Sequence, residues 1–131
     1  MNNPYVEDWS TAPKGMLERY ENRRACIEKY GFAIPNEEAI RKLVTLSPIV
    51  EMGAGIGYWA SLIAEAGGQI EAYDKFLGVE NAYTFKHRDP WFPVQSGEPE
   101  LLKTHPANTL FLSWPCYKSP FANDCLKAFQ G

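Results

Sequence analysis

Residues 48–75 read PIVEMGAGIGYWASLIAEAGGQIEAYDK, and this stretch decides the fold. The apolar run at residues 48–52 predicts a short buried strand, and the glycine-rich turn at residues 53–57 predicts its end. Apolar side chains then recur on one helix face until the pair Gly67-Gly68. Residues 69–74 predict the next strand. The stretch therefore predicts a βαβ unit with parallel strands and a right-handed crossover.

Two helices are expected before this unit, after a polar lead-in at residues 1–12. The first spans residues 13–30, and its apolar face comprises Met16, Leu17, Tyr20, Ile27 and Tyr30. The second begins after Asn36, a residue type that caps helices well, and ends near residue 47. Its apolar face comprises Ala39, Ile40, Leu43 and Val44.

The remainder of the chain is more interrupted, because residues 76–108 contain four prolines. We expect a short edge strand at residues 92–94 and a short helix at 98–104. Residues 109–113 predict an apolar strand. A terminal helix follows, with Gly131 at its C-cap and with Ala122, Cys125, Leu126 and Phe129 on its apolar face. Alternating strands and helices predict one α/β domain over residues 1–131, with helices at 13–47 and the core at 48–131.

The composition is typical of a globular protein, with 131 residues, 45% hydrophobic residues and a net charge of −3. This mild negative charge indicates neither nucleic acid nor an anionic membrane as a partner. No stretch approaches the roughly 20 apolar residues that span a bilayer, and the N-terminus does not resemble a signal peptide. The three cysteines lack zinc-site spacing, which favours free thiols and no metal. We expect a soluble, cytoplasmic protein.

The main chemical signal is the segment Glu51 to Gly57, in which an acidic residue precedes three glycines at alternate positions. A glycine turn between a strand and a helix allows close approach of a ligand, and open α/β sheets bind ligands there. The dinucleotide fingerprint requires glycine where Tyr58 stands, which argues against a nicotinamide-dependent oxidoreductase. Asp74 ends the next strand, where a carboxylate can accept hydrogen bonds from ribose hydroxyls. Alternatively, the glycines and Asp74 only form turns.

The loop and Asp74 together resemble the first motifs of class I methyltransferases. The resemblance implies that the loop packs against the methionine part of S-adenosylmethionine. It also implies that Glu51 orients the loop and the ligand's amino group, and that Asp74 holds the ribose. The implied cofactor-binding residues are Glu51, Gly53, Ala54, Gly55, Gly57, Tyr58, Asp74 and Lys75.

A second motif follows the strand at residues 109–113. Amino-methylating members of the family have Asp/Asn-Pro-Pro-aromatic there, whereas this chain has Trp114-Pro115-Cys116-Tyr117. The implied acceptor-side residues are Ser113, Trp114 and Tyr117. Packing in the core or at the rim is the alternative for the two aromatic residues, and Cys116 is either an attacking thiol or, as we favour, a packed side chain.

Residues 30–129 also resemble a little-characterised group of methyltransferase-like proteins. The shared features are Ile34-Pro35 at a helix start, the segment at 48–60, Tyr73-Asp74 at a strand end, and the segment at 110–117. This resemblance bears on the fold and hardly on the substrate.

The resemblance implies a Rossmann-like fold, which in the family has seven strands in the order 3-2-1-4-5-7-6. This chain ends after the helix that follows strand 4. We therefore expect a C-terminally truncated version with about four mostly parallel strands in the order 3-2-1-4 and helices on both faces. Strand 4 would then be a sheet edge, which favours a homo-oligomer over a marginally folded remnant.

The resulting functional hypothesis is a protein that binds S-adenosylmethionine and transfers its methyl group to an unidentified acceptor, with an amine as the favoured class. The altered second motif keeps an alternative open. That alternative is a non-catalytic or cofactor-degrading S-adenosylmethionine-binding protein, or an interaction subunit.

Overall fold

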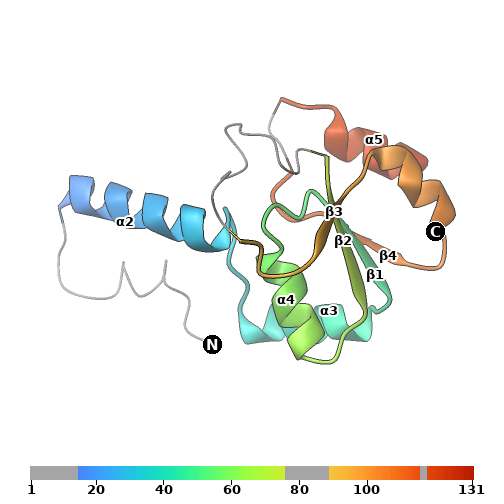
Figure 1. Cartoon of the computed structure of the whole chain (residues 1–131), viewed down its shortest axis with the longest axis horizontal. Coiled ribbons are helices and arrows are strands. Elements are labelled where there is room, and N and C mark those ends of the chain that lie inside the picture. Colours follow the sequence, from blue (N-terminus) through green and yellow to red (C-terminus); the bar gives the residue numbers. More distant parts are fainter. Residues whose placement is uncertain (1–14, 76–88, 116–117) are drawn as a thin grey trace.

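The computed structural model describes residues 15–75, 89–115 and 118–131 (Figure 1). Two helices come first, and strands and helices are interspersed after them. They are α2 (Met16–Tyr30), α3 (Glu37–Thr45), β1 (Ile49–Met52), α4 (Tyr58–Glu65), β2 (Ile70–Asp74), β3 (Val94–Ser96), the 3-10 helix η1 (Pro99–Thr104), β4 (Thr109–Phe111) and α5 (Phe121–Ala128).

The four strands form one sheet in the order β3-β2-β1-β4, and every neighbouring pair is parallel. Ile49 of β1 lies opposite both Ile70 of β2 and Thr109 of β4. The α/β fold and the strand order 3-2-1-4 predicted from the sequence are thus confirmed. All four residues of β1 are buried, as expected for a central parallel strand that is covered on both faces.

Helices cover both faces of the sheet (Figure 1). Successive side chains of β1 pack into different cores. Ile49 packs with Ile40 of α3 and Ile63 of α4 on one face. Val50 and Met52 pack on the other face with buried side chains from η1 and α5, namely Leu102, Phe121, Cys125 and Ala128. Burial of each large aliphatic side chain contributes roughly 1.5–3 kcal/mol, so these two layers hold β1 in the centre.

The start of α3 was predicted correctly. The side-chain oxygen of Asn36 accepts a hydrogen bond from the backbone N–H of Ala39 over 2.8 Å. The segment before α3 is attached to α4, because the indole Nε1 of Trp59 donates to the carbonyl of Ala33 over 2.8 Å. This bond brings residues from before the sheet close to the loop that follows β1.

The apolar face predicted for the first helix is wrong at Leu17, which is 70% exposed. The reason is tertiary. Helix α2 extends away from the sheet, so its first turns lie outside the two cores that the described residues form (Figure 1). Its last residue is anchored instead, since the ring of Tyr30 lies 4.9 Å from the ring of Tyr58 and 5.9 Å from that of Trp91.

After β2, two strands and one helix differ from their predictions. The edge strand lies at Val94–Ser96 rather than at 92–94, because Pro93 has no N–H to donate to a ladder. The expected helix at 98–104 is the 3-10 helix η1. Strand β4 ends at Phe111, which lies opposite Glu51 of β1, two residues earlier than predicted.

The terminal helix buries a face that differs in part from the predicted one. Leu126 is 64% exposed, whereas Phe121, Cys125 and Ala128 are buried at helical spacing. Phe129, not Gly131, occupies the C-cap, and its N–H donates to the carbonyl of Cys125.

Cys125 is a buried free thiol, as predicted, and Cys116 lies outside the described residues. None of the helices in the described part of the chain is long and apolar enough to cross a membrane.

Candidate functional site

The turn after β1 depends on backbone conformations that favour glycine. Gly53, Gly55 and Gly57 have φ angles of 78°, 57° and 75°. The N–H groups of Gly53 and Ala54 both donate to the carbonyl of Tyr73, over 2.9 and 3.0 Å. The turn is therefore fastened to the end of β2 as well as to its own strand.

Gly57 has a packing role in addition to its conformation. A Cβ at this position would lie 3.0 Å from side-chain atoms of both Phe92 and Val94. Only glycine allows the segment before β3 to pack this closely against the N-cap of α4.

Asp74 is the last residue of β2, and it holds the same turn. Its Oδ2 accepts a hydrogen bond from the backbone N–H of Gly55 over 2.9 Å. The side chain is 7% exposed. This carboxylate thus fixes the middle of the glycine loop across the gap between two neighbouring strands.

Glu51 lies beneath the loop, on the central strand. It is 2% exposed, and its Oε2 has no hydrogen-bond partner within the described part of the chain. Burial and, to a smaller extent, the nearby charge of Asp74 raise the pKa of Glu51 to about 8. A buried carboxyl without a partner prefers its neutral form, because the charged form has lost its water.

A pocket opens at the carboxyl edge of the sheet, and it brings together both groups of residues predicted from the sequence. The predicted cofactor residues that line it are Glu51, Gly53, Ala54, Gly55, Asp74 and Lys75, and the predicted acceptor-side residues that line it are Ser113 and Trp114.

Two of the predicted site residues in the described part of the chain do not line this pocket. Gly57 starts α4 and packs on the segment before β3. The ring of Tyr58 packs against the end of α2, 4.9 Å from the ring of Tyr30, and it lies 5.1 Å from the ring of Trp91. Tyr117 lies outside the described residues.

The apolar walls of the pocket were not predicted from the sequence as part of the site. These walls include Phe32, Ala33, Trp59, Pro115 and Phe121. They come from four separate parts of the chain, and no local pattern distinguishes them from core residues. Trp59 packs in the core, 5.2 Å from the ring of Phe111, and also lines the pocket.

Trp114 stands at the mouth of the pocket in an unusual conformation. Its φ is 54°, in the left-handed region that a bulky residue rarely adopts, and it is 59% exposed. Its ring is stacked on that of Phe32, with centroids 6.0 Å apart and planes 5° apart. Trp114 therefore lies at the rim rather than in the core. Backbone strain of this kind is often found at functional sites.

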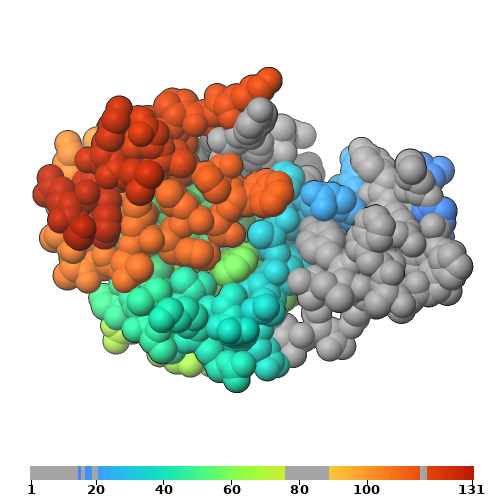
Figure 2. Space-filling model, turned by 180° about the vertical axis from the view of Figure 1, so that it is seen from behind, coloured from blue at the N-terminus to red at the C-terminus, as the bar shows by residue number. Residues whose placement is uncertain are grey.

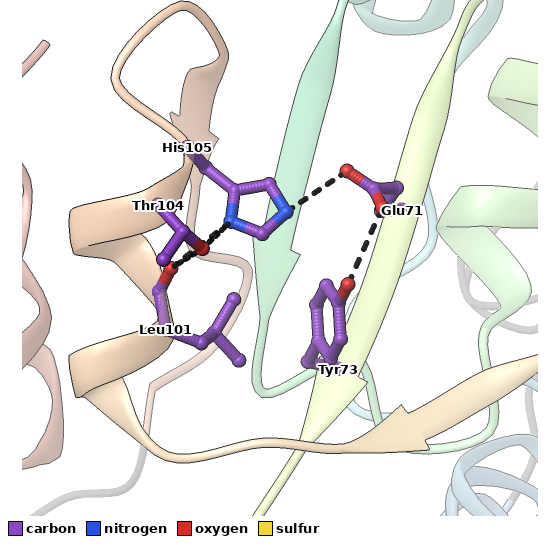
Figure 3. A network of polar contacts seen from close by, with 5 residues as sticks. All are labelled: Glu71, Tyr73, Leu101, Thr104 and His105. Atoms are coloured by element: carbon purple, nitrogen blue, oxygen red, sulfur yellow. Dashed lines mark hydrogen bonds and ion pairs between the residues drawn. The ribbon is translucent and has the colours of Figure 1, made fainter.

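A second polar cluster lies on β2 and η1 and does not line the pocket (Figure 3). His105 Nε2 lies 3.1 Å from a carboxylate oxygen of Glu71, and the hydroxyl of Tyr73 donates to the other oxygen over 3.3 Å. The ring's Nδ1 lies 3.0 Å from the carbonyl of Leu101. The hydroxyl oxygen of Thr104 lies 2.9 Å from the same Nδ1. These contacts attach the end of η1 to the sheet, which is a structural role.

No group of three or more potential metal ligands was found among residues 15–75, 89–115 and 118–131. Comparisons with protein family models, with curated proteins and with solved structures found no match.

Proposed function

We propose that this chain has a Rossmann-like methyltransferase fold, binds S-adenosylmethionine in the pocket at the carboxyl edge of its sheet, and transfers the methyl group to an amine. The observation on which this proposal rests is the bond from Gly55 to Asp74. It places a glycine loop of acid-x-Gly-x-Gly-x-Gly spacing and a strand-end carboxylate in one pocket.

The chemistry of the lining supports this ligand. Asp74 is placed to accept hydrogen bonds from ribose hydroxyls, and the unpartnered oxygen of Glu51 suits a cationic group. Aromatic walls at Phe32 and Trp59 suit an apolar or cationic ligand surface. A dinucleotide is disfavoured, because its pyrophosphate would approach two carboxyl groups and because Tyr58 replaces the third fingerprint glycine.

When bound, the cofactor supplies a methyl group on a positively charged sulfur, which a neutral amine can attack directly. The protein's contribution is mainly alignment. Ser113 and the backbone near Trp114 line the same pocket as the loop, so they are placed to orient an acceptor amine. The amine passes one proton to solvent after the transfer.

Calorimetry with S-adenosylmethionine, S-adenosylhomocysteine and NAD tests the binding step. We expect heat from both sulfur ligands and none from NAD. Mass spectrometry of an amine-rich extract, incubated with cofactor that has a deuterated methyl group, then tests the transfer. Absence of binding by either sulfur ligand would refute the proposal.

The second candidate is a protein that binds the cofactor without transferring its methyl group. Trp114 favours it, because this residue occupies the motif position where amino-methylating enzymes have Asp or Asn, and because it is exposed at the rim. Binding without a labelled product, or conversion of the cofactor alone, would support this candidate over the first.

A further inference from the structure

Glu51 is a buried acidic residue in the pocket to which the proposed function assigns the ligand. It stands on the central strand of the sheet, is 2% exposed and lines the pocket. Its Oε2 is buried and has no hydrogen-bond partner among the described residues. A buried acceptor without a partner is costly, and native proteins rarely retain one unless a ligand, a proton or water satisfies it.

Burial and the neighbouring Asp74 make an ionised Glu51 unfavourable in the empty pocket. Asp74, on the neighbouring strand, is the second carboxyl group, and Lys75 is the one positively charged residue in the described lining. The walls from α4, from α5 and from the segments before α3 and after β4 are uncharged. They comprise Phe32, Ala33, Trp59, Phe121, Ser113, Trp114 and Pro115. Burial and Asp74 together raise the pKa of Glu51 to about 8, so the carboxyl is neutral at pH 7.

We propose that Glu51 exchanges its proton for the cationic group of the ligand. In the empty protein Glu51 is a carboxylic acid. When the ligand enters, the O–H bond breaks, the proton passes to solvent, and the carboxylate pairs with the positive charge. The net charge of the pocket is unchanged by the exchange, so the low-dielectric site never holds an unpaired carboxylate. This inference rests on the proposed function, because it takes S-adenosylmethionine as the ligand.

Because of this exchange, Glu51 determines the preference of the site for a cationic ligand over a neutral one. A neutral ligand of the same shape leaves the proton in place and gains no ion pair. For a cationic ligand, the proton competes with the ligand, so affinity rises with pH by up to about tenfold per unit below about pH 8. The cation has two possible sources in S-adenosylmethionine, the ammonium and the sulfonium.

Calorimetry in buffers of different ionisation enthalpy counts the protons that binding releases. A pH of about 6.5 is suitable, because the free α-amino group of the ligand, with a pKa of about 7.7–8.0, is then almost fully charged. We expect S-adenosylmethionine to release about one proton per site from the wild-type protein and almost none from Glu51→Gln.

Two further ligands identify the source of the cation. S-adenosylhomocysteine keeps the ammonium and lacks the sulfonium charge, and methylthioadenosine lacks both. Release of about one proton by S-adenosylhomocysteine assigns the exchange to the ammonium, and its absence assigns the exchange to the sulfonium. Methylthioadenosine should release none in either case.

Binding of S-adenosylmethionine to the wild-type protein without proton release overturns the exchange but leaves the proposed function intact. If Glu51→Gln releases as many protons as the wild-type protein, the exchange is overturned as well. If neither sulfur ligand binds, the proposed function and the exchange both fail. Should Glu51→Gln not fold, the wild-type protein alone is decisive. Its dissociation constant for S-adenosylmethionine should fall about tenfold per unit between about pH 5.5 and 7, and a flat profile overturns the exchange.

Discussion

The backbone N–H of Gly55 donates a hydrogen bond of 2.9 Å to Oδ2 of Asp74. The two residues are separated by an entire helix in the sequence, yet this bond joins the loop after β1 to the end of β2. Asp74 therefore has a structural role in the loop, in addition to the ribose-binding role proposed for it.

Substitution of Asp74 by alanine should weaken binding of S-adenosylmethionine by about 1–3 kcal/mol, the usual cost of losing hydrogen bonds to a charged group. Titration calorimetry measures the change. Glu71→Ala is the matched control, because Glu71 lies on the same strand, its side chain is 51% exposed and it does not line the pocket. Equal affinities for the wild-type protein and Asp74→Ala would contradict the assigned role.

The stability of the empty protein should depend on the ionisation of Glu51. Its pKa is about 8 in the folded protein against an ordinary value of 4.5, so the folded state binds this proton more tightly than the unfolded state. The resulting stabilisation is complete below about pH 4.5 and is lost as the pH rises to about 8. The glutamine of Glu51→Gln does not ionise, so this variant should not lose stability in this way.

Denaturant unfolding of both proteins between about pH 5 and 9 measures the effect. The wild-type protein should lose a few kcal/mol relative to Glu51→Gln over this range, with the difference levelling off above about pH 8. If the unfolding free energies of the wild-type protein and Glu51→Gln change with pH in parallel, Glu51 is not buried as described.

Gly57→Ala should destabilise the protein by roughly 2–4 kcal/mol. The alanine would be held in a left-handed backbone conformation, and its Cβ would also be too close to Phe92 and Val94. Gly67→Ala is the control. Gly67 has a φ of 91°, but a Cβ there has nothing within 4 Å, so only about 1–2 kcal/mol should be lost. If the two variants unfold at the same denaturant concentration, the contact at Gly57 is unimportant.

The free edge of β4 should pair with a second copy of the chain. Among the described residues β4 pairs with β1 alone, and an apolar groove beside it is lined in part by Leu110, Leu126 and Phe129. In Figure 2 the orange surface around β4 lies between the cyan surface of α3 and the red surface of α5. An open strand edge is self-complementary in a two-fold dimer, because each strand supplies both donors and acceptors.

Light scattering after size-exclusion chromatography should therefore give the mass of a dimer. Leu126→Lys should shift the protein to the monomer. Leu17→Lys, at a residue that is 70% exposed on α2, should not change the mass. A wild-type monomer at tens of micromolar would refute the pairing.

The sequence by itself determined the centre of this protein. The run from β1 to β2 was predictable because strand, glycine turn, helix and strand each depend on neighbouring residues, and Glu51, Gly55 and Asp74 stand at fixed places in that local pattern. The N-cap at Asn36 was predictable for the same reason.

Only the tertiary structure decided which side chains share the pocket and which protonation state Glu51 adopts. Phe32, Trp59 and Phe121 look like core residues in the sequence and meet at the site because distant segments pack around the carboxyl edge. The exposure of Leu17 and Leu126 also depends on what packs beside them. Burial and charge act through space, so a pattern of neighbours along the chain cannot specify them.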